Sequence, residues 1–291
     1  MAASEQTMIT FSALSYSTIP QIGAFLANPP ANSPAAEWRL VWGPVATVLT
    51  KGNLAYIAQT AGKCAVVVRG TYPHPDPAFF QDLFEDLTIG VQVGWPYSQT
   101  AGPKIAAGTM DGLKDVLSLK DPASGLSILD YLQQSPQAGL DIHVTGHSLG
   151  GCLSTVIASR LRYELGANAN ILPCTFAAPT AGNQAFADLF TSQFPNASRY
   201  FNTLDVIPKA WADLASVKAL YPAPGPACPL VVAGVIDALS IPLKLLNYKQ
   251  PNGGGIPLPG TPTATGDFVA EVLAQHDSAN YLKLLGAPGL P

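Results

Sequence analysis

The sequence predicts an α/β protein with a mostly parallel central sheet that is covered by helices on both faces. β-rich segments alternate with helical segments between residues 100 and 208, and this alternation is typical of parallel sheets. Three further β-rich segments near the N-terminus are joined by short turns, which predicts an antiparallel edge to the same sheet. The chain has 291 residues, of which 48% are hydrophobic, so we expect one large domain over residues 1–291.

A helical segment opens the chain and extends to about residue 27, where the prolines of PPANSP indicate a loop. The three β-rich segments come next, separated by KGN and AGK, at residues 38–50, 54–60 and 64–70. Because the separating turns are short, we expect consecutive strands to pair as an antiparallel meander.

Residues 72–95 differ in character from the meander, and we interpret them as a lid. The segment begins with three prolines in five residues and continues with apolar side chains spaced as one face of a short helix. These side chains are Phe79, Phe80, Leu83, Phe84 and Leu87. The alternative is that they pack on the core.

The rest of the chain supplies the predicted parallel strands and their helices. In order, we expect a helical stretch over 101–134, a strand over 140–145, a helix over 152–166 and strands over 168–179 and 198–208. Residues 210–265 are rich in proline and glycine, which indicates an insertion with one interrupted helix and a loop. A final helix follows His276.

Composition excludes several classes of function. The net charge is -4, the pI is near 5.5, and no run of Lys or Arg is present, so we expect no nucleic-acid partner. The four histidines and four cysteines do not have the spacing of metal ligands, and we expect no metal site and buried free thiols. Mean hydropathy is positive, so apolar surface is expected to remain exposed.

The N-terminal segment lacks the basic start and the uninterrupted apolar stretch of a secretory signal. No stretch of about 18 residues is apolar enough for a transmembrane helix. The sequence therefore predicts a soluble protein that is cytoplasmic or exported without a cleaved leader. It does not indicate an oligomeric state.

Residues 144–151, VTGHSLGG, join a predicted strand to a predicted helix through a serine between glycines. In a nucleophile elbow the serine lies on a strained turn, and Gly146 and Gly150 are required where a side chain would strike the neighbouring strand and helix. The free N–H groups of the following helix also favour an oxyanion at this point. We predict Ser148 as a nucleophile; the alternative is a structural serine in a glycine turn.

A serine needs a base, and the sequence offers four histidines. His147 adjoins Ser148 and its side chain should leave the turn in another direction, while His143 lies in the strand and is expected to pack. His74 lies among prolines at the start of the predicted lid. We expect His276 on a loop after the sheet strands and before the last helix, in the order Ser, acid, His of the α/β hydrolases. We predict it as the base; the alternative is a surface histidine.

The acid should follow a sheet strand between Ser148 and His276, where it can orient the imidazole. The candidates are Asp188, Asp205, Asp213, Asp237, Asp267 and Glu271. Asp205 alone comes directly after a predicted strand, and Pro208 suits a fixed loop. We predict Asp205; the alternative is a solvated carboxylate.

The oxyanion of an acyl-transfer reaction needs two N–H donors. The first is expected from Leu149, the residue after the nucleophile, and the second from a loop after an earlier strand. VVVRGTY fits the second position, because Gly70 allows close approach and Thr71 offers both its N–H and its hydroxyl. The alternative for Thr71 is a β-branched residue that merely ends a strand.

Four ordered motifs together resemble the class 3 lipases, the family of the fungal triacylglycerol lipases and their bacterial relatives. They are VRGT at 68–71, VTGHSLGG at 144–151, FNTLDVIP at 201–208 and HxxxxYL at 276–282. The resemblance implies an α/β hydrolase fold, the triad Ser148, Asp205 and His276, oxyanion donors Thr71 and Leu149, and a helical lid directly after the first motif. The lid segment is longer and richer in proline than in the family, and the interval between acid and base carries an apolar insertion.

We expect hydrolysis of carboxylic esters of lipids through an acyl-enzyme, that is, a triacylglycerol lipase that requires no cofactor. The predicted lid would cover the site in water and contact a lipid surface. The alternatives are an esterase of soluble short-chain or aryl esters such as a feruloyl esterase, a phospholipase A1, or an inactive lipid-binding protein.

Overall fold

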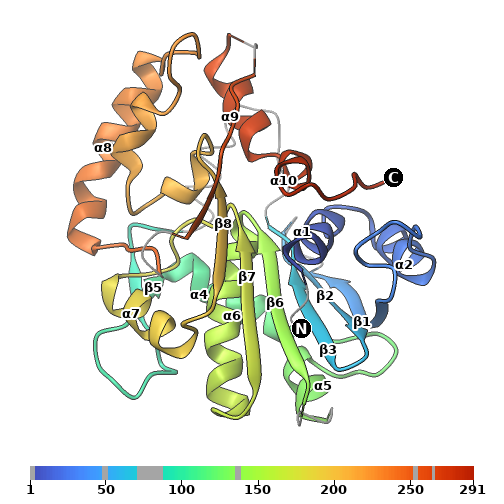
Figure 1. Cartoon of the computed structure of the whole chain (residues 1–291). Helices are drawn as coiled ribbons and strands as arrows, with labels where there is room; N and C mark the ends of the chain where they lie inside the picture. Colours follow the sequence, from blue (N-terminus) through green and yellow to red (C-terminus); the bar gives the residue numbers. More distant parts are fainter. Residues whose placement is uncertain (1–3, 48–51, 71–87, 135–138, 252–254, 264–265) are drawn as a thin grey trace.

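The computed structural model describes residues 4–47, 52–70, 88–134, 139–251, 255–263 and 266–291. Its centre is a seven-stranded sheet in the order β1-β2-β3-β6-β7-β8-β9 (Figure 1). The first three strands pair antiparallel, as the meander predicted: β1 (Arg39–Ala46), β2 (Leu54–Thr60) and β3 (Lys63–Val68). The other four continue from β3 in parallel: β6 (Asp141–His147), β7 (Asn170–Phe176), β8 (Ser198–Asn202) and β9 (Ile256–Leu258).

Helices cover both faces of this sheet. One face carries α1 (Glu5–Leu14), α2 (Ile19–Ala27) and α10 (Ser278–Leu284). The other carries α4 (Ala107–Ser118), α5 (Ile128–Gln134), α6 (Leu149–Leu165) and α7 (Gln184–Gln193). None of the helices in the described part of the chain is both long and apolar enough to span a membrane.

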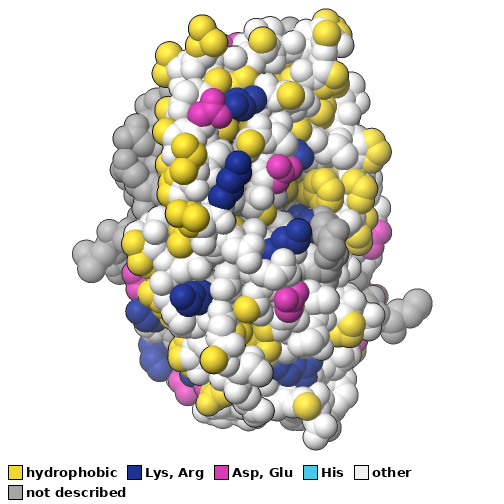
Figure 2. Space-filling view, turned by 90° about the vertical axis from the view of Figure 1, so that its left-hand side faces the viewer, with side chains coloured by type: hydrophobic (Ala, Val, Ile, Leu, Met, Phe, Trp, Pro, Cys, Tyr) yellow, Lys and Arg dark blue, Asp and Glu magenta, His cyan; other side chains and the backbone are white. Residues whose placement is uncertain are grey.

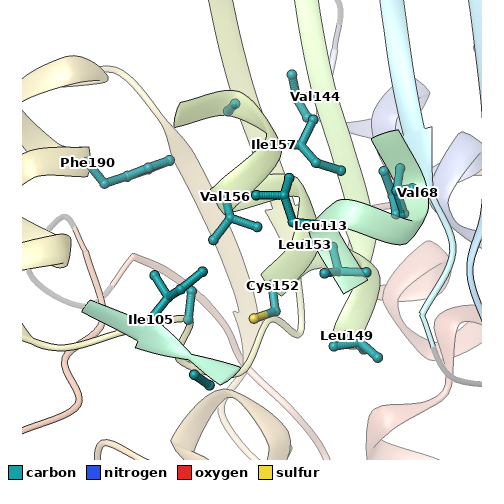
Figure 3. Close-up of a cluster of buried hydrophobic side chains, with 14 of the residues drawn as sticks. Val68, Ile105, Leu113, Val144, Leu149, Cys152, Leu153, Val156, Ile157 and Phe190 are labelled. Atoms are coloured by element: carbon teal, nitrogen blue, oxygen red, sulfur yellow. The ribbon is translucent and has the colours of Figure 1, made fainter. Parts of the chain in front are cut away.

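Two hydrophobic cores lie on the two sides of the sheet, because neighbouring residues of each strand point to opposite faces and both faces are covered. α6 supplies much of one core. Figure 3 shows Leu153, Val156 and Ile157 of α6 beside Leu113 of α4 and Val144 of β6. This packing holds α6, and with it the turn that enters the helix, firmly against β6.

The predicted N-terminal helix is two helices. Ser4 caps α1, and α2 begins at a capping box in which Thr18 and Gln21 satisfy each other's backbone N–H groups. The capping residues favour a new helix start over continuation through Ser15–Ser17. The predicted helical stretch over 101–134 likewise divides into β5 (Lys104–Ala106), α4 and α5, and β5 pairs with β4 (Gln92–Gly94).

The insertion over 210–265 contributes a strand that its sequence did not predict. α8 (Leu230–Leu246) contains Pro242 and is the expected interrupted helix, and two 3₁₀ turns precede it, at Ile207–Lys209 and Leu214–Ala219. β9 then adds to the edge of the main sheet. An edge strand tolerates Pro257, which has no N–H to donate, better than a central strand would. A three-residue strand containing proline has no usable periodicity. α9 (Phe268–His276) and α10 close the chain.

Candidate active site

Ser148 occupies the turn between β6 and α6 in a backbone conformation that is rare for any residue with a side chain. Its φ and ψ are 60° and -133°. Such conformations cost of order 1–3 kcal/mol and persist only where the surrounding structure imposes them. Here Ser148 N–H donates to the carbonyl of Phe176 on β7 at 3.0 Å, and the packed helix α6 begins at the next residue. The turn has the form expected of a nucleophile elbow.

The glycines around Ser148 are required by close backbone approach. A Cβ at Gly146 would strike the backbone of Gly150, and a Cβ at Gly150 would strike the carbonyl oxygen of Val68 on β3. At Gly151 the added atom would lie 2.9 Å from the Cβ of Ala178. The clearance predicted at positions 146 and 150 is therefore real, and it lets the start of α6 approach the ends of β3 and β6.

The structure brings Ser148, His276 and Asp205 together from three distant segments. Nε2 of His276 lies 2.8 Å from Oγ of Ser148, and Nδ1 lies 2.8 Å from Oδ2 of Asp205. All three residues are buried. An ionised carboxylate only accepts hydrogen bonds, so Nδ1 carries the proton and Nε2 is free to accept the serine proton. This is the arrangement of a Ser-His-Asp triad.

His276 does not lie on a loop, as the sequence suggested, but is the last residue of α9. A buried polar network holds this helix end. Asn202 donates from Nδ2 to the backbone oxygen of Gln275 at 2.9 Å and to its side-chain oxygen at 2.7 Å. Gln275 in turn donates to Glu271 at 2.8 Å, and Glu271 accepts from the N–H of Thr263 at 2.9 Å. The position of the imidazole is thus tied to the end of β8.

Asp205 follows β8, and both of its carboxylate oxygens accept hydrogen bonds. Oδ1 accepts from the N–H of Ile207 at 2.9 Å, and Oδ2 accepts from the hydroxyl of Tyr281 at 2.7 Å in addition to its contact with His276. Burial and the adjacent Asp205 raise the pKa of Tyr281 well above its ordinary value, so its hydroxyl stays a donor. These three hydrogen bonds fix the orientation of the carboxylate towards the imidazole.

His147 packs against the imidazole ring of His276. Its ring lies 4.7 Å from the ring of His276, centroid to centroid, at an interplanar angle of 34°. Nδ1 of His147 lies 3.1 Å from the hydroxyl of Tyr16 in the segment after α1. Burial, together with the neighbouring His276, holds the pKa of His147 well below its ordinary value, so this ring is neutral. Its Nε2 has no hydrogen-bond partner among the described residues, so His147 is not bonded to Ser148 as a base would be.

Of the two predicted oxyanion donors, the structure describes only Leu149. Leu149 is the first residue of α6, and its N–H belongs to the first turn, whose N–H groups have no acceptor within the helix. Thr71 lies outside the described residues. The preceding Gly70 lies at the elbow, since a Cβ there would be 2.8 Å from the carbonyl oxygen of His147 and 3.1 Å from the nitrogen of Gly150. Gly70 therefore lies directly beside the elbow that carries Ser148.

The sequence model of the family described as Lipase (class 3) matches residues 65–214, about half of the chain and including VRGT, the elbow and Asp205. The chain belongs to the class 3 lipases. Among solved structures, it is similar to M37 lipase, with 29% identity, a TM-score of 0.86, and coverage of 98% of this chain and 93% of that one. The central sheet and its helices accordingly form the α/β hydrolase fold.

Two more distant proteins are similar to parts of this chain. The Rhizomucor miehei lipase, solved as a propeptide complex, shares the fold at 24% identity and a TM-score of 0.54, over 71% of this class 3 lipase and 62% of that chain. Lipase ZK262.3 of Caenorhabditis elegans is 34% identical over 82 residues. That match spans 28% of this chain and 23% of the relative, so it covers less than a quarter of the relative's length.

The other candidate acids of this class 3 lipase, which the sequence reasoning set aside, lie elsewhere. Asp188, Asp213, Asp237 and Asp267 are exposed, and Glu271 is buried within the network that holds α9. Asp267 caps α9, and Asp237 pairs with Lys218. Within the described residues no group of three or more His, Cys, Asp or Glu side chains could hold a metal ion, and all four cysteines are free thiols. The predicted lid residues Phe79, Phe80, Leu83, Phe84 and Leu87 lie outside the described residues.

Sequence reasoning did not assign roles to Tyr281, Tyr16 and Asn202, although each contacts a triad residue or its direct support. Tyr281 stood within the motif HxxxxYL, five residues after His276. Its position in the first turns of α10 directs its hydroxyl to Asp205 and to the N–H of Asn202, which donates to it at 2.9 Å. Tyr16 and Asn202 carried no local signal, because their partners lie far away along the chain.

Proposed function

We propose that this class 3 lipase hydrolyses carboxylic esters of lipids, with triacylglycerols as the substrate class. The observation that carries the proposal is the continuous hydrogen-bonded series from Ser148 through His276 to Asp205, at 2.8 Å for each contact. The family supports a lipid ester as substrate. The burial of the three residues favours a site from which water is largely excluded before substrate enters.

Ser148 Oγ attacks the ester carbonyl while Nε2 of His276 takes its proton. The carbonyl carbon becomes tetrahedral, and its oxyanion is stabilised by the N–H of Leu149 and by Thr71. His276 then returns the proton to the departing alkoxide of the glycerol, which leaves an acyl group on Ser148. Water then attacks the acyl carbon while Nε2 of His276 takes one of its protons. The bond between the acyl carbon and Oγ breaks, the fatty acid leaves, and His276 returns the proton to Oγ of Ser148. Asp205 holds the imidazole and stabilises the imidazolium, and no step requires a cofactor.

Labelling by an organophosphonate, followed by turnover of p-nitrophenyl butyrate, tests the proposal. We expect Ser148→Ala to lose labelling and to lose turnover by about 10⁴ to 10⁶, with an unchanged fold by circular dichroism. Ser192→Ala is the matched control, because Ser192 is an exposed serine of α7 whose hydroxyl donates to the backbone oxygen of Leu189. Turnover near normal in Ser148→Ala would refute the assignment of the nucleophile.

The substrate class is tested by a series of esters from two to eighteen carbons in the acyl chain. A lipase turns over long-chain triacylglycerol emulsions. Activity confined to soluble short-chain or aryl esters would overturn the lipid substrate, and release of one fatty acid from phospholipids alone would identify a phospholipase A1. We also propose that Phe79, Phe80, Leu83, Phe84 and Leu87 form a lid that meets the lipid surface, which predicts a rise in rate as substrate passes its solubility limit.

A further inference from the structure

The outward face of α8 is apolar along its whole length. At 100° per residue, one side of the helix carries eight residues that are all exposed and uncharged. We name them the outer stripe: Leu230, Val231, Gly234, Val235, Ala238, Ile241, Pro242 and Leu245. Leu230 is 90% exposed, Leu245 is 86% exposed and Ile241 is 71% exposed. A surface helix ordinarily has polar residues on this side.

The opposite face of α8 already supplies what the fold needs. Ile236 and Leu243 are buried, and Val232, Leu239 and Leu246 pack against the core beside them. The helix would remain docked if the outer stripe were polar. An apolar stripe that contributes nothing to the core and is exposed to water indicates a contact surface.

The outer stripe lies at the same end of the sheet as the candidate active site. α8 and α9 extend together beyond the ends of the parallel strands, and α9 ends at His276 (Figure 1). Ile236 and Leu243 on the inner face share a core cluster with Tyr221 and Phe268, whose rings are 5.3 Å apart. A surface that meets α8 therefore meets the end of the molecule at which Ser148 lies.

The charge around α8 differs in sign from that of the whole chain. Residues 209–249 contain four lysines and two aspartates, a balance of +2, whereas the chain carries -4. Lys209 and Lys218 pair with Asp213 and Asp237. Lys244 and Lys249 are exposed and have no ion-pair partner among the described residues. Figure 2 shows this side of the molecule, where hydrophobic and basic side chains lie together.

We infer that the outer stripe docks on the surface of a phospholipid bilayer that carries negative charge. The stripe consists of aliphatic residues, proline and glycine, and it lacks the Tyr, Trp, Arg and Met that are enriched in protein interfaces. α8 is 17 residues long, about 25 Å, which suits a helix lying along a surface better than one crossing it. The inference rests on the proposed function, because it explains how the site is brought to lipid esters.

Binding to vesicles tests the inference with the whole chain. Ile241→Glu places a charge in the outer stripe, and Ile19→Glu makes the same change at a residue that is 44% exposed on α2, on the other side of the sheet region in Figure 1. With vesicles of phosphatidylcholine containing about one fifth phosphatidylglycerol, we expect co-sedimentation of wild type. We expect Ile241→Glu to bind at least about tenfold more weakly and Ile19→Glu to bind as wild type does.

The basic border is tested separately. Lys244→Glu with Lys249→Glu should weaken binding to the anionic vesicles at least about fivefold, and should change binding to pure phosphatidylcholine far less. Raising the salt concentration should have the same effect on wild type. An equal loss of binding to both kinds of vesicle would contradict the part of the inference that requires negative charge on the lipid surface.

Two results overturn the docking surface itself. The first is equal binding of wild type and Ile241→Glu. The second is a wild-type dimer in analytical ultracentrifugation that Ile241→Glu converts to a monomer, which would make a second copy of the chain the partner. Hydrolysis of soluble p-nitrophenyl butyrate keeps this test apart from that of the proposed function, since Ile241→Glu should leave it unchanged. Absence of hydrolysis in wild type would reject the function without deciding the binding.

Discussion

The hydroxyl of Tyr281 donates a hydrogen bond of 2.7 Å to Oδ2 of Asp205, the same carboxylate oxygen that faces Nδ1 of His276. Tyr281 is fully buried and reaches across from α10, while Asp205 follows β8. Hydrogen bonds to a charged group are worth more than those between neutral groups. Tyr281 is therefore a positioning residue for the proposed triad, since it acts on the carboxylate and not on substrate.

Tyr281→Phe should lower kcat by about tenfold to a hundredfold while leaving KM near the wild-type value. The reason is that the hydrogen bond from Tyr281 orients the carboxylate of Asp205, which stabilises the imidazolium of His276 during the reaction. The buried N–H of Asn202 also loses its acceptor, so the free energy of unfolding should fall by about 1–3 kcal/mol. Steady-state kinetics on p-nitrophenyl butyrate and urea titration measure the two effects. Tyr200→Phe is the control, because Tyr200 stacks on Phe176 away from Asp205; a kcat for Tyr281→Phe equal to that of this control would contradict the role.

Replacement of Ser148 by glycine should separate catalysis from backbone strain. Ser148→Gly and Ser148→Ala both remove the nucleophile, but glycine adopts the observed φ of 60° and ψ of -133° without the clash that a Cβ meets. We expect Ser148→Gly to be more stable than Ser148→Ala by about 1 kcal/mol, although glycine ordinarily lowers stability. Chemical denaturation of the two variants checks the sign. A lower stability for the glycine variant would show that the elbow is not strained.

Gly150→Ala should strongly destabilise the protein, because the added methyl group meets the backbone of Val68 and Gly70 at the end of β3, and this central strand cannot withdraw. We expect a loss of more than about 3 kcal/mol in the free energy of unfolding, or failure to accumulate as soluble protein. Gly23→Ala is the matched control. Gly23 lies in α2 with nothing within 4 Å of the added atom, and this change should stabilise by about 0.5–1 kcal/mol. Similar effects of the two substitutions would contradict the close approach.

His143 should make the protein less stable in acid. Burial lowers the pKa of His143 to about 4, whereas an unfolded histidine titrates near about 6.5. Above that value the ring is neutral in both states and contributes no pH dependence. As the pH falls from about 6.5 towards about 4, the histidine binds a proton in the unfolded chain but not in the folded protein. The free energy of unfolding therefore falls by up to about 3 kcal/mol.

The variant His143→Leu should flatten this part of the stability profile. Urea titrations at several pH values between 4 and 8 measure it, and the value at pH 8 gives the packing effect of the substitution alone. His147 is buried and neutral as well, so a smaller acid dependence should remain in the variant. An unchanged slope between wild type and His143→Leu would assign the acid sensitivity to other groups.

Local sequence was sufficient where a pattern and its partners lie close together. The alternation of strands and helices predicted the parallel sheet, the short turns predicted the meander, and the glycines around Ser148 predicted a turn with close backbone approach. Asp205 and His276 could be chosen because few acids and histidines were present and their order along the chain was informative. Short segments such as β9, and the helical end that carries His276, had too few residues for any periodicity to identify them.

What the sequence by itself determined was the set of residue types and their order: a serine between glycines, an acid after a strand, a histidine near the end, and a long apolar insertion. Only the tertiary structure decided that Tyr281 reaches Asp205, that His147 lies against His276, and that one side of α8 faces water. The physical reason is that strand alternation and glycine clearance arise from interactions within a few residues. Contacts between segments 71 to 128 residues apart, as in the proposed triad, depend on how the whole sheet is assembled.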